Sequence, residues 1–240
     1  MKKLCLLLLL FLSHFLLMPL ETTHAKGKQE PVPDTVADSH SKYSAYYQVT
    51  STRFCSAILI SSTAALTAKH CVGAKPAKRS GRIYPGLNGN KRPFGYMNIR
   101  TYTPHPNPKY DIAILKGTER DQDEFYKYYI RKFSTTVKGY TDEEFRAFMG
   151  QDAYAYGYPH GKQFRNNVQY RSDGKITSYK TKPIPYLLTD MPAFSGQSGS
   201  GVFKKDGKFL GIMVTRTKKN TANILPFTES IAKWINENAK

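Results

Sequence analysis

Short apolar runs, broken by glycine, proline and polar residues, make up most of this chain beyond its first 40 residues. Clear examples are residues 45–49, 56–60, 153–157 and 208–214. Runs of this length, bounded by turn-forming residues, are typical of β-strands, whereas helices need apolar positions spaced three and four apart over longer stretches. The pattern therefore predicts a mainly β body.

Helical patterns are visible at two places. Thr141-Asp142-Glu143-Glu144 combines a capping residue with acids in the first turn, as is typical of a helix N-terminus. Thr228 is a second capping candidate, and three apolar residues share one helical face after it: Ile231, Trp234 and Ile235. We therefore expect a helix start inside a charged, tyrosine-rich connecting segment at residues 118–150, and a C-terminal helix at about 228–238.

The first 25 residues have the organisation of a secretory signal peptide. Met1-Lys2-Lys3 is followed by an apolar run from Leu4 to Leu20 and by a small-residue site ending at Ala25. A membrane anchor is the alternative, but Ser13 and His14 interrupt the apolar run. We expect cleavage after Ala25 and a secreted, extracellular protein without stable membrane insertion.

The next segment, residues 26–41, contains lysines, prolines and scattered polar residues without apolar periodicity. Such a composition is typical of a chain end that lacks a packed face. We expect a flexible leader, which is either a short propeptide or a plain disordered tail.

The formal net charge of +18 makes the surface strongly basic. Such a field attracts anionic partners, and anionic cell-surface polymers are candidates. The basic residues are dispersed along the chain. Two local clusters are present, for which solvated loops are the commoner explanation: Lys75, Lys78, Arg79 and Arg82, and Arg216, Lys218 and Lys219. No nucleic-acid module is recognisable, so we do not expect specific nucleic-acid binding.

Three segments carry the candidate chemistry, in the order Thr67-Ala68-Lys69-His70-Cys71, Tyr110-Asp111-Ile112-Ala113 and Gly196-Gln197-Ser198-Gly199. Amide hydrolysis at neutral pH needs an activated hydroxyl, a base near pKa 7 and a carboxylate that orients the base. We therefore interpret Ser198, His70 and Asp111 as a catalytic triad. The chain order His, Asp, Ser is that of chymotrypsin-type enzymes and differs from other triad orders.

Two supports for this triad follow from its surroundings. Residues 54–60 and 64–68 are predicted to pair as a hairpin, so Cys55 is the expected disulfide partner of Cys71. Cys5 would be removed with the signal peptide, and the remaining even pair suits an oxidising compartment, although two free thiols are the alternative. Glycines around Ser198 permit a tight turn, and the amides of Gly196 and Ser198 are the expected oxyanion-hole donors.

With these motifs the chain resembles chymotrypsin-like serine endopeptidases, and among them the secreted glutamyl endopeptidases and exfoliative toxins of Gram-positive bacteria, a group that includes virulence factors. The resemblance covers about residues 42–238 and includes further motifs: Gly157-Tyr158-Pro159, Gly174-Lys175-Ile176-Thr177 and Gly211-Ile212. It implies two packed antiparallel six-stranded β-barrels with the active site between them. We expect a first barrel at 42–117 and a second at 151–227, followed by the C-terminal helix.

The chain departs from these relatives at the primary pocket. Glutamyl endopeptidases resemble one another in a Ser or Thr shortly before the catalytic serine and a His after Gly-Ile, where this chain has Ala193 and Met213. Neither side chain hydrogen-bonds a substrate carboxylate. With Pro192 and Phe194 nearby, these residues favour a neutral, apolar pocket. The substrate backbone is expected to lie along Val214 and Thr215.

We therefore predict a secreted, monomeric serine endopeptidase of narrow specificity that acts on protein or peptide substrates. It needs no cofactor, and no metal-binding motif is recognisable in the sequence. The chain also departs from mammalian-type members at Gln197. Those enzymes carry at this position an Asp that pairs with the N-terminus formed on activation. The alternative is a latent or non-catalytic protease-fold protein that binds anionic surfaces or a host partner.

Overall fold

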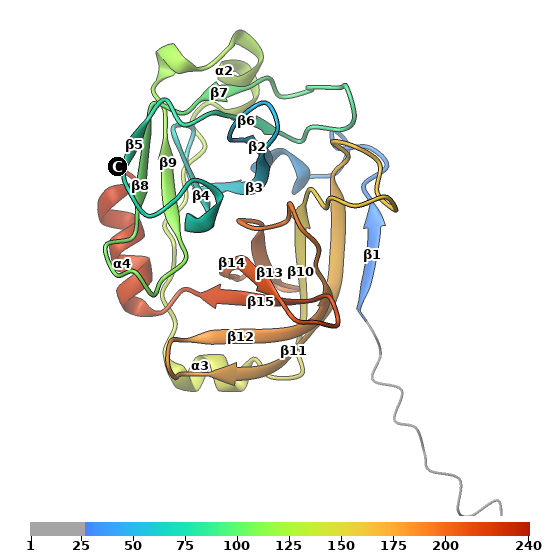
Figure 1. The fold of residues 1–240 in the computed structure, drawn as a ribbon, viewed down its shortest axis with the longest axis vertical. Helices are drawn as coiled ribbons and strands as arrows, with labels where there is room; N and C mark the ends of the chain where they lie inside the picture. Colours follow the sequence, from blue (N-terminus) through green and yellow to red (C-terminus); the bar gives the residue numbers. More distant parts are fainter. Residues whose placement is uncertain (1–26) are drawn as a thin grey trace, which may run out of the picture.

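Two antiparallel β-sheets, one above the other in Figure 1, build the part of the chain that the structure describes, residues 27–240. The structure is a computed structural model. The signal-peptide prediction for residues 1–25 lies outside the described residues. Between residues 27 and 240 no helix combines the length and apolar character needed to cross a membrane.

The first sheet has eight strands in the order β5-β8-β9-β4-β3-β2-β6-β7. Strand β4 is buried along its whole length, and its neighbours β3 and β9 each have only one residue that is not fully buried. This burial explains why their sequences are continuous apolar runs rather than alternating ones. The strands are β2 (Ser44–Gln48), β3 (Phe54–Leu59), β4 (Ala64–Thr67), β5 (Ala77–Lys78), β6 (Arg82–Pro85), β7 (Met97–Asn98), β8 (Thr101–Pro104) and β9 (Ala113–Lys116).

The second sheet closes on itself, because β11 pairs with both β10 and β12. Six strands form this barrel, and a seventh, β1, is added outside β11. The members are β1 (Lys28–Pro31), β10 (Asp152–Gly157), β11 (Tyr170–Lys180), β12 (Tyr186–Pro192), β13 (Gly201–Lys204), β14 (Phe209–Arg216) and β15 (Thr221–Pro226). The all-β, chymotrypsin-like double-barrel prediction is confirmed, although among the described residues strand pairing closes only the second barrel.

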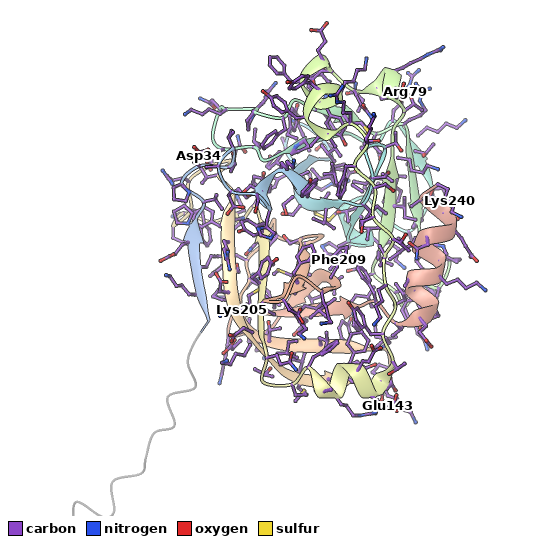
Figure 2. The ribbon with its side chains drawn as sticks, turned by 180° about the vertical axis from the view of Figure 1, so that it is seen from behind. Asp34, Arg79, Glu143, Lys205, Phe209 and Lys240 are labelled. Atoms are coloured by element: carbon purple, nitrogen blue, oxygen red, sulfur yellow. A yellow bond between two sulfur atoms is a disulfide. The ribbon has the colours of Figure 1, made fainter. Side chains whose placement is uncertain are left out.

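Helices cover the outside of the sheets. Within residues 27–240, the α-helices are α2 (Glu124–Ile130), α3 (Asp142–Ala147) and α4 (Glu229–Asn238), and the 3₁₀ helices are η1 (Ser41–Tyr43), η2 (Lys69–Cys71) and η3 (Glu119–Asp121). The predicted C-terminal helix is present as α4, with Thr228 as its N-cap. Figure 2 shows Lys240 at the end of this helix, beside the first sheet, and Glu143 on α3, beside the second.

The expected helix start at Thr141 is a full capping box. Thr141 Oγ1 accepts from Glu144 N at 3.2 Å, and Glu144 Oε2 accepts from Thr141 N at 2.9 Å. Backbone amides that have no partner inside the helix are thereby satisfied. These two contacts explain why the helix begins at this point of the connecting segment.

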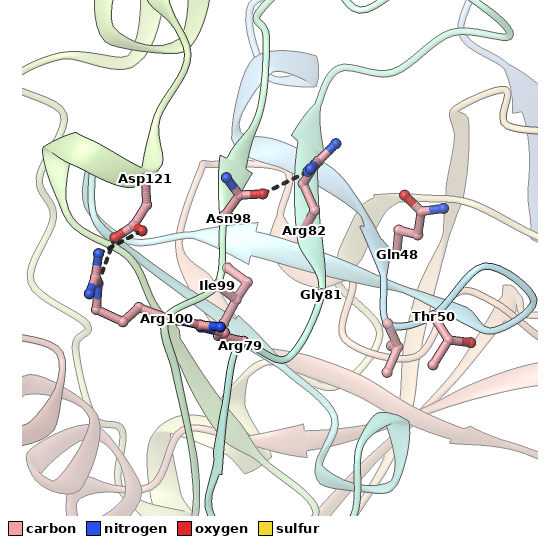
Figure 3. Close-up of a pocket in the computed structure, with 10 residues that line it drawn as sticks. Gln48, Thr50, Arg79, Gly81, Arg82, Asn98, Ile99, Arg100 and Asp121 are labelled. Carbon is pink, nitrogen blue, oxygen red and sulfur yellow. Dashed lines mark hydrogen bonds and ion pairs between the residues drawn. The ribbon is translucent and has the colours of Figure 1, made fainter.

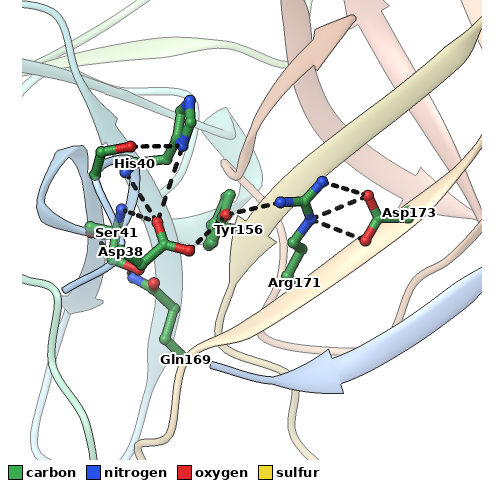
Figure 4. A network of polar contacts seen from close by, with 8 residues as sticks. Asp38, His40, Ser41, Tyr156, Gln169, Arg171 and Asp173 are labelled. Carbon is green, nitrogen blue, oxygen red and sulfur yellow. Dashed lines mark hydrogen bonds and ion pairs between the residues drawn. The ribbon is translucent and has the colours of Figure 1, made fainter. Parts of the chain in front are cut away.

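Residues 28–31 differ from the expected flexible leader, because they form strand β1 and pair with β11 in the register Lys28 to Asp173 through Pro31 to Tyr170. Polar contacts hold the segment that follows (Figure 4). Tyr156 Oη donates to Asp38 at 2.8 Å, and Gln169 Nε2 donates to the Ser41 carbonyl at 3.2 Å. Backbone pairing needs no apolar periodicity, so the sequence pattern gave no sign of this strand.

One buried apolar cluster contains residues of both sheets. It joins Leu59 and Leu66 of the first sheet to Ile212 and Leu225 of the second, and it includes Ile231 of α4. The shared core fixes the two sheets against each other. Segments at their boundary can therefore be held at hydrogen-bond distance although they lie far apart in the sequence.

Candidate active site

His70 lies in η2, directly after the buried strand β4. The predicted disulfide between Cys55 and Cys71 is confirmed, with the two Cα atoms 6.2 Å apart across a sequence separation of 16. It connects η2 to β3, and closing a loop of this length stabilises a fold by about 3 kcal/mol on the chain-entropy model. Tyr102 Oη adds bonds to the carbonyls of Lys69 at 2.9 Å and Gly73 at 2.6 Å. The position of the histidine is therefore held from both sides.

Asp111 lies just before β9 and contacts His70 at two points. Its Oδ1 accepts from the backbone N of His70 at 2.9 Å, and its Oδ2 lies 2.7 Å from His70 Nδ1. Lys69 Nζ donates to the carbonyls of Asn107 at 3.2 Å and Pro108 at 2.9 Å, which holds the approach to Asp111. Burial lowers the pKa of Lys69, and the nearby Asp111 opposes that shift. The double contact fixes the plane of the imidazole ring.

Ser198 Oγ lies 2.9 Å from His70 Nε2, so the structure brings His70, Asp111 and Ser198 together as the sequence predicted. Glycines with positive φ flank the serine, Gly196 at 88° and Gly199 at 91°. A Cβ on Gly196 would lie 2.4 Å from the Tyr158 carbonyl oxygen, and one on Gly199 would lie 2.1 Å from that of Ser56. Only glycine fits at either position.

Ser56, in strand β3, holds this turn against the first sheet. Its N donates to the Ser198 carbonyl at 2.9 Å, and its Oγ donates to the Gly196 carbonyl at 2.9 Å. Its Oγ also accepts from Tyr158 N at 3.0 Å. The sequence analysis did not identify this residue, since a serine inside an apolar strand gives no local sign of contacts 140 residues away.

The backbone N–H groups of Gly196 and Ser198 donate to no acceptor within residues 27–240. The N–H of Gly196 shares its peptide unit with the carbonyl of Ser195, which accepts from His160 N at 2.7 Å. The N–H of Ser198 shares its peptide unit with the carbonyl of Gln197, which accepts from Ser200 N at 3.0 Å. A trans peptide is planar with its N–H opposite its C=O, so both N–H groups face away from these contacts. Two adjacent backbone N–H groups without a partner are the kind of donors that can stabilise an oxyanion.

A cavity of about 480 Å³ adjoins these atoms. It is lined by His70, Asp111, Ala193, Phe194, Ser195, Ser198, Met213, Val214, Thr215 and Arg216. Five of the six predicted pocket residues are therefore brought together, whereas Pro192 lines a neighbouring cavity that shares Phe194. Ala193 and Met213 are 1% and 2% exposed. Besides Asp111 and His70, the lining contains one further ionisable side chain, Arg216.

One cluster of potential metal ligands in the described part of the chain includes His70. Within residues 27–240, the atoms of Cys55, His70 and Cys71 lie close enough to share an ion, but both sulfurs are consumed in the disulfide. A disulfide sulfur is not the thiolate that binds metals. The histidine is engaged by Asp111 and Ser198 instead.

A second cavity, of about 620 Å³, lies on the first sheet (Figure 3). Its lining includes Arg79 and Arg82, which belong to the first predicted basic cluster. Arg100 is paired with Asp121 through two bonds of 3.0 Å, and the same contact lowers the pKa of Asp121. Arg82 donates to Asn98 at 2.8 Å, and its guanidinium lies 4.3 Å from the ring centre of Tyr96. Nothing in this cavity resembles a nucleophile and base pair.

Comparison with known proteins relates the chain to peptidases. A family model described as a trypsin-like peptidase domain matches residues 55–212. Similar solved structures include a Glu endopeptidase in complex with MPD, with a TM-score of 0.70, 21% identity, and coverage of 87% of this chain and 95% of that chain. No curated protein sequence matches the chain.

Two further solved structures have the same fold. Protease Anisep from Arthrobacter nicotinovorans gives a TM-score of 0.64 at 16% identity, covering 88% of this chain and 99% of that one. The thermostable serine protease AL20 from an extremophilic microorganism gives 0.63 at 15% identity, covering 83% and 97%. At these identities the likeness is one of fold.

Proposed function

The chain belongs to the trypsin-like peptidase family and is a serine endopeptidase, and on that premise we propose that His70, Asp111 and Ser198 are its catalytic triad. The observation that carries this proposal is the continuous path of contacts, 2.7 Å from Asp111 to His70 and 2.9 Å from His70 to Ser198. The path supplies a nucleophile, a base and an orienting carboxylate.

In the proposed mechanism, Ser198 Oγ attacks the carbonyl carbon of the scissile bond while its proton passes to His70 Nε2. The tetrahedral intermediate then collapses, the C–N bond breaks, and His70 returns the proton to the leaving amine. Water, deprotonated by the same histidine, attacks the acyl-enzyme and releases the carboxylic acid and free Ser198. Asp111 stabilises the imidazolium that forms in each half-reaction.

The amides of Gly196 and Ser198 are the proposed oxyanion hole. Their N–H groups have no acceptor in the described chain and are fixed by bonds to the opposite side of each peptide unit. Such fixed donors cost no reorganisation when the negative charge develops. Each contributes about 2.7–4 kcal/mol to transition-state stabilisation in comparable sites.

We propose a primary pocket that accepts a neutral, apolar side chain. Ala193 and Met213 are buried in the cavity and offer no hydrogen bond to a carboxylate. Leaving a substrate charge unpaired there would cost several kcal/mol, in the range of about 2–7 kcal/mol for an uncompensated polar group and more for an ion. Arg216 also lines this cavity, but it is exposed and follows the buried residues of β14.

The substrate backbone is proposed to pair with β14. On one side of β14, the pairing with β13 extends only as far as Ile212. The next residue, Met213, bonds instead to the backbone of Gly199 and Ser200 in the turn that contains Ser198. On the other side, β15 continues to Arg216. The edge at Val214 and Thr215 is therefore open to an added antiparallel strand, which would align the scissile bond with Ser198.

Secretion is proposed from the signal-like N-terminus together with the disulfide. The disulfide Cys55–Cys71 is characteristic of an oxidising compartment. In such a setting the basic surface meets anionic polymers, and we propose the cavity of Figure 3 as one contact point. Asp121, the carboxylate of this cavity, is paired with Arg100, and among residues 27–240 no carboxylate neutralises Arg79 or Arg82. Arg82 also donates to Asn98 at 2.8 Å and to Tyr84 at 3.2 Å, while Arg79 is exposed.

A peptide library incubated with the secreted protein and analysed by mass spectrometry tests the proposed enzyme and its pocket. We expect cleavage after apolar residues and none with a Ser198→Ala variant. Cleavage that survives in the variant would contradict the triad, and strong cleavage after Glu would contradict the pocket. Failure of an active-site serine phosphonate to label the protein would instead favour the non-catalytic alternative.

A further inference from the structure

A buried amide network lies directly behind the Ser198 turn. Gln197 is fully buried, and its Oε1 accepts from Phe194 N at 2.9 Å and from Gln29 Nε2 at 3.0 Å. Its Nε2 donates to Ser172 Oγ at 3.3 Å. The same Ser172 Oγ accepts from Gln29 Nε2 at 2.6 Å. Two amides and one hydroxyl thus form a closed ring of contacts beside the proposed oxyanion donors.

Gln29 reaches this network because of the strand in which it lies. β1 pairs with β11 in a register that sets Gln29 opposite Ser172. Successive side chains of a strand point to opposite faces, so Lys28 and Glu30 are exposed whereas Gln29 turns towards the barrel and is half-buried. The strand itself is held by four register pairs and by the Val32 N bond to the Gln169 carbonyl at 2.8 Å.

The network restrains the turn at residues 194–198, because Gln197 is bonded to Phe194 and is the chain neighbour of Gly196 and Ser198. Gln197 N donates to the Phe194 carbonyl at 3.2 Å, and the Gln197 side chain accepts from Phe194 N, so one residue closes residues 194–197 twice. Gly196 and Ser198 are the immediate neighbours of Gln197. A displacement of the Gln197 amide would therefore turn the two peptide units whose N–H groups face the reacting carbonyl.

We propose that Gln29 is a positioning residue of the proposed active site: its side-chain amide holds Gln197, and through it the oxyanion donors Gly196 and Ser198. The inference rests on the proposed function of these residues. The supporting group is the side chain of a residue inside strand β1. The contact joins two neutral amides, those of Gln29 and Gln197, and involves no charged chain terminus. A closed ring of hydrogen bonds restrains the groups that form it, and a fixed donor array is what oxyanion stabilisation requires.

The contacts that follow β1 in the chain explain how a segment near the N-terminus can serve as a fixed support. Asp38 accepts from Tyr156 Oη at 2.8 Å, and Arg171 donates to the same hydroxyl at 3.2 Å while it also binds Asp173 (Figure 4). A Cβ on Gly27 would lie 2.6 Å from the Asp173 carbonyl oxygen, so the chain just before β1 also packs closely. The donor at Gln29 is thus held from both directions.

The test compares the secreted wild-type protein with Gln29→Leu, which keeps approximate side-chain size and removes the donor. Glu30→Gln is the matched control, because it changes a solvent-facing residue of the same strand. We expect Gln29→Leu to lower kcat about tenfold with KM changed less than about twofold, a smaller loss than removing an oxyanion donor outright. Inactivation by a serine phosphonate, whose oxygen occupies the oxyanion position, should slow by the same factor.

The low-field proton resonance of the His70–Asp111 bond separates positioning from general damage. It should be unchanged in Gln29→Leu, whereas a disordered protein would lose it together with activity. An unchanged kcat would overturn the proposal, as would a KM effect alone or full activity in a protein whose first residue lies beyond Pro31. Should Gln29→Leu not fold, Ser172→Ala removes the other partner of the Gln29 amide and must show the same kcat loss.

The experiments distinguish a failure of the proposed triad from a failure of the proposed role of Gln29. Activity that persists in Ser198→Ala would overturn the triad whatever Gln29 does. Normal wild-type activity together with an inactive Ser198→Ala and a fully active Gln29→Leu would leave the triad standing and overturn the positioning role.

Discussion

Asp111 holds His70 by its backbone and by its ring at the same time, with Oδ1 2.9 Å from the backbone N and Oδ2 2.7 Å from Nδ1. One carboxylate therefore fixes both the place of the residue and the rotation of its imidazole. In the proposed triad, Nδ1 carries the proton that faces the carboxylate, and Nε2 is the proton acceptor towards Ser198.

Replacing Asp111 by Asn should lower kcat by about 10⁴, because the amide favours the wrong imidazole tautomer while the geometry is kept. The measurement is steady-state hydrolysis of a peptide found in the library. Asp152→Asn is the control, since Asp152 is paired with the exposed Lys175 at 2.6 Å on the second barrel. Comparable losses in both variants would contradict the assigned role of Asp111.

Removing the disulfide with Cys55→Ser and Cys71→Ser together should lower the free energy of unfolding by about 2–4 kcal/mol. The physical reason is the greater freedom of the unfolded chain and the release of η2 from β3. Urea unfolding followed by tryptophan fluorescence gives the value. The reduced wild-type protein should match the double variant, and an unchanged unfolding midpoint would argue against a stabilising role.

Adding polar groups to the primary pocket should change its preference. Ala193→Ser together with Met213→His places a hydroxyl and an imidazole at two lining positions that now have apolar side chains. We expect kcat/KM for a Glu peptide to rise at least about tenfold relative to the matching apolar peptide, since paired polar groups discriminate strongly. Competition between the two peptides in one reaction measures this ratio directly. No change in the ratio would show that these positions do not contact the substrate side chain.

The double variant Arg79→Gln and Arg82→Gln should weaken binding of a sulfated oligosaccharide probe. Two fewer cations in the cavity should elute the protein at lower salt and flatten the dependence of affinity on ionic strength. Arg131→Gln with Arg165→Gln removes the same charge from exposed sites elsewhere. If both pairs shift binding equally, the effect is one of net charge and the cavity is not a specific contact point.

The Arg100–Asp121 pair should make stability depend on pH. The hydrogen bond from Arg100 holds the pKa of Asp121 below its usual value, so the folded state favours the charged carboxylate. This contribution is present above the unfolded pKa near 3.8 and is lost as pH falls through the lower folded value. Asp121→Asn should therefore be less stable than wild type at pH 7, and the gap should close towards pH 2. A gap that stays constant between these pH values would contradict the linkage.

Much of this protein follows from local sequence. Apolar runs identified the strands around His70 and Asp111, glycines identified the Ser198 turn, and the Thr141 capping box identified its helix. Each of these signals depends on neighbours in the chain, such as a capping residue, a positive φ or a continuous buried face. Such signals are readable because backbone geometry and burial restrict residue type within a few positions.

Only the tertiary structure decided the contacts between distant polar residues. The bond of Ser56 to Gly196 spans 140 positions, and that of Gln29 to Gln197 spans 168. Serine and glutamine occur mostly on solvent-exposed surfaces, so the residue type alone does not indicate a buried hydrogen-bond partner. The sequence placed the proposed nucleophile, base and carboxylate on strands and turns that suit those roles. The packing of two sheets and the pairing of β1 with β11 decided which amides and hydroxyls hold them in place.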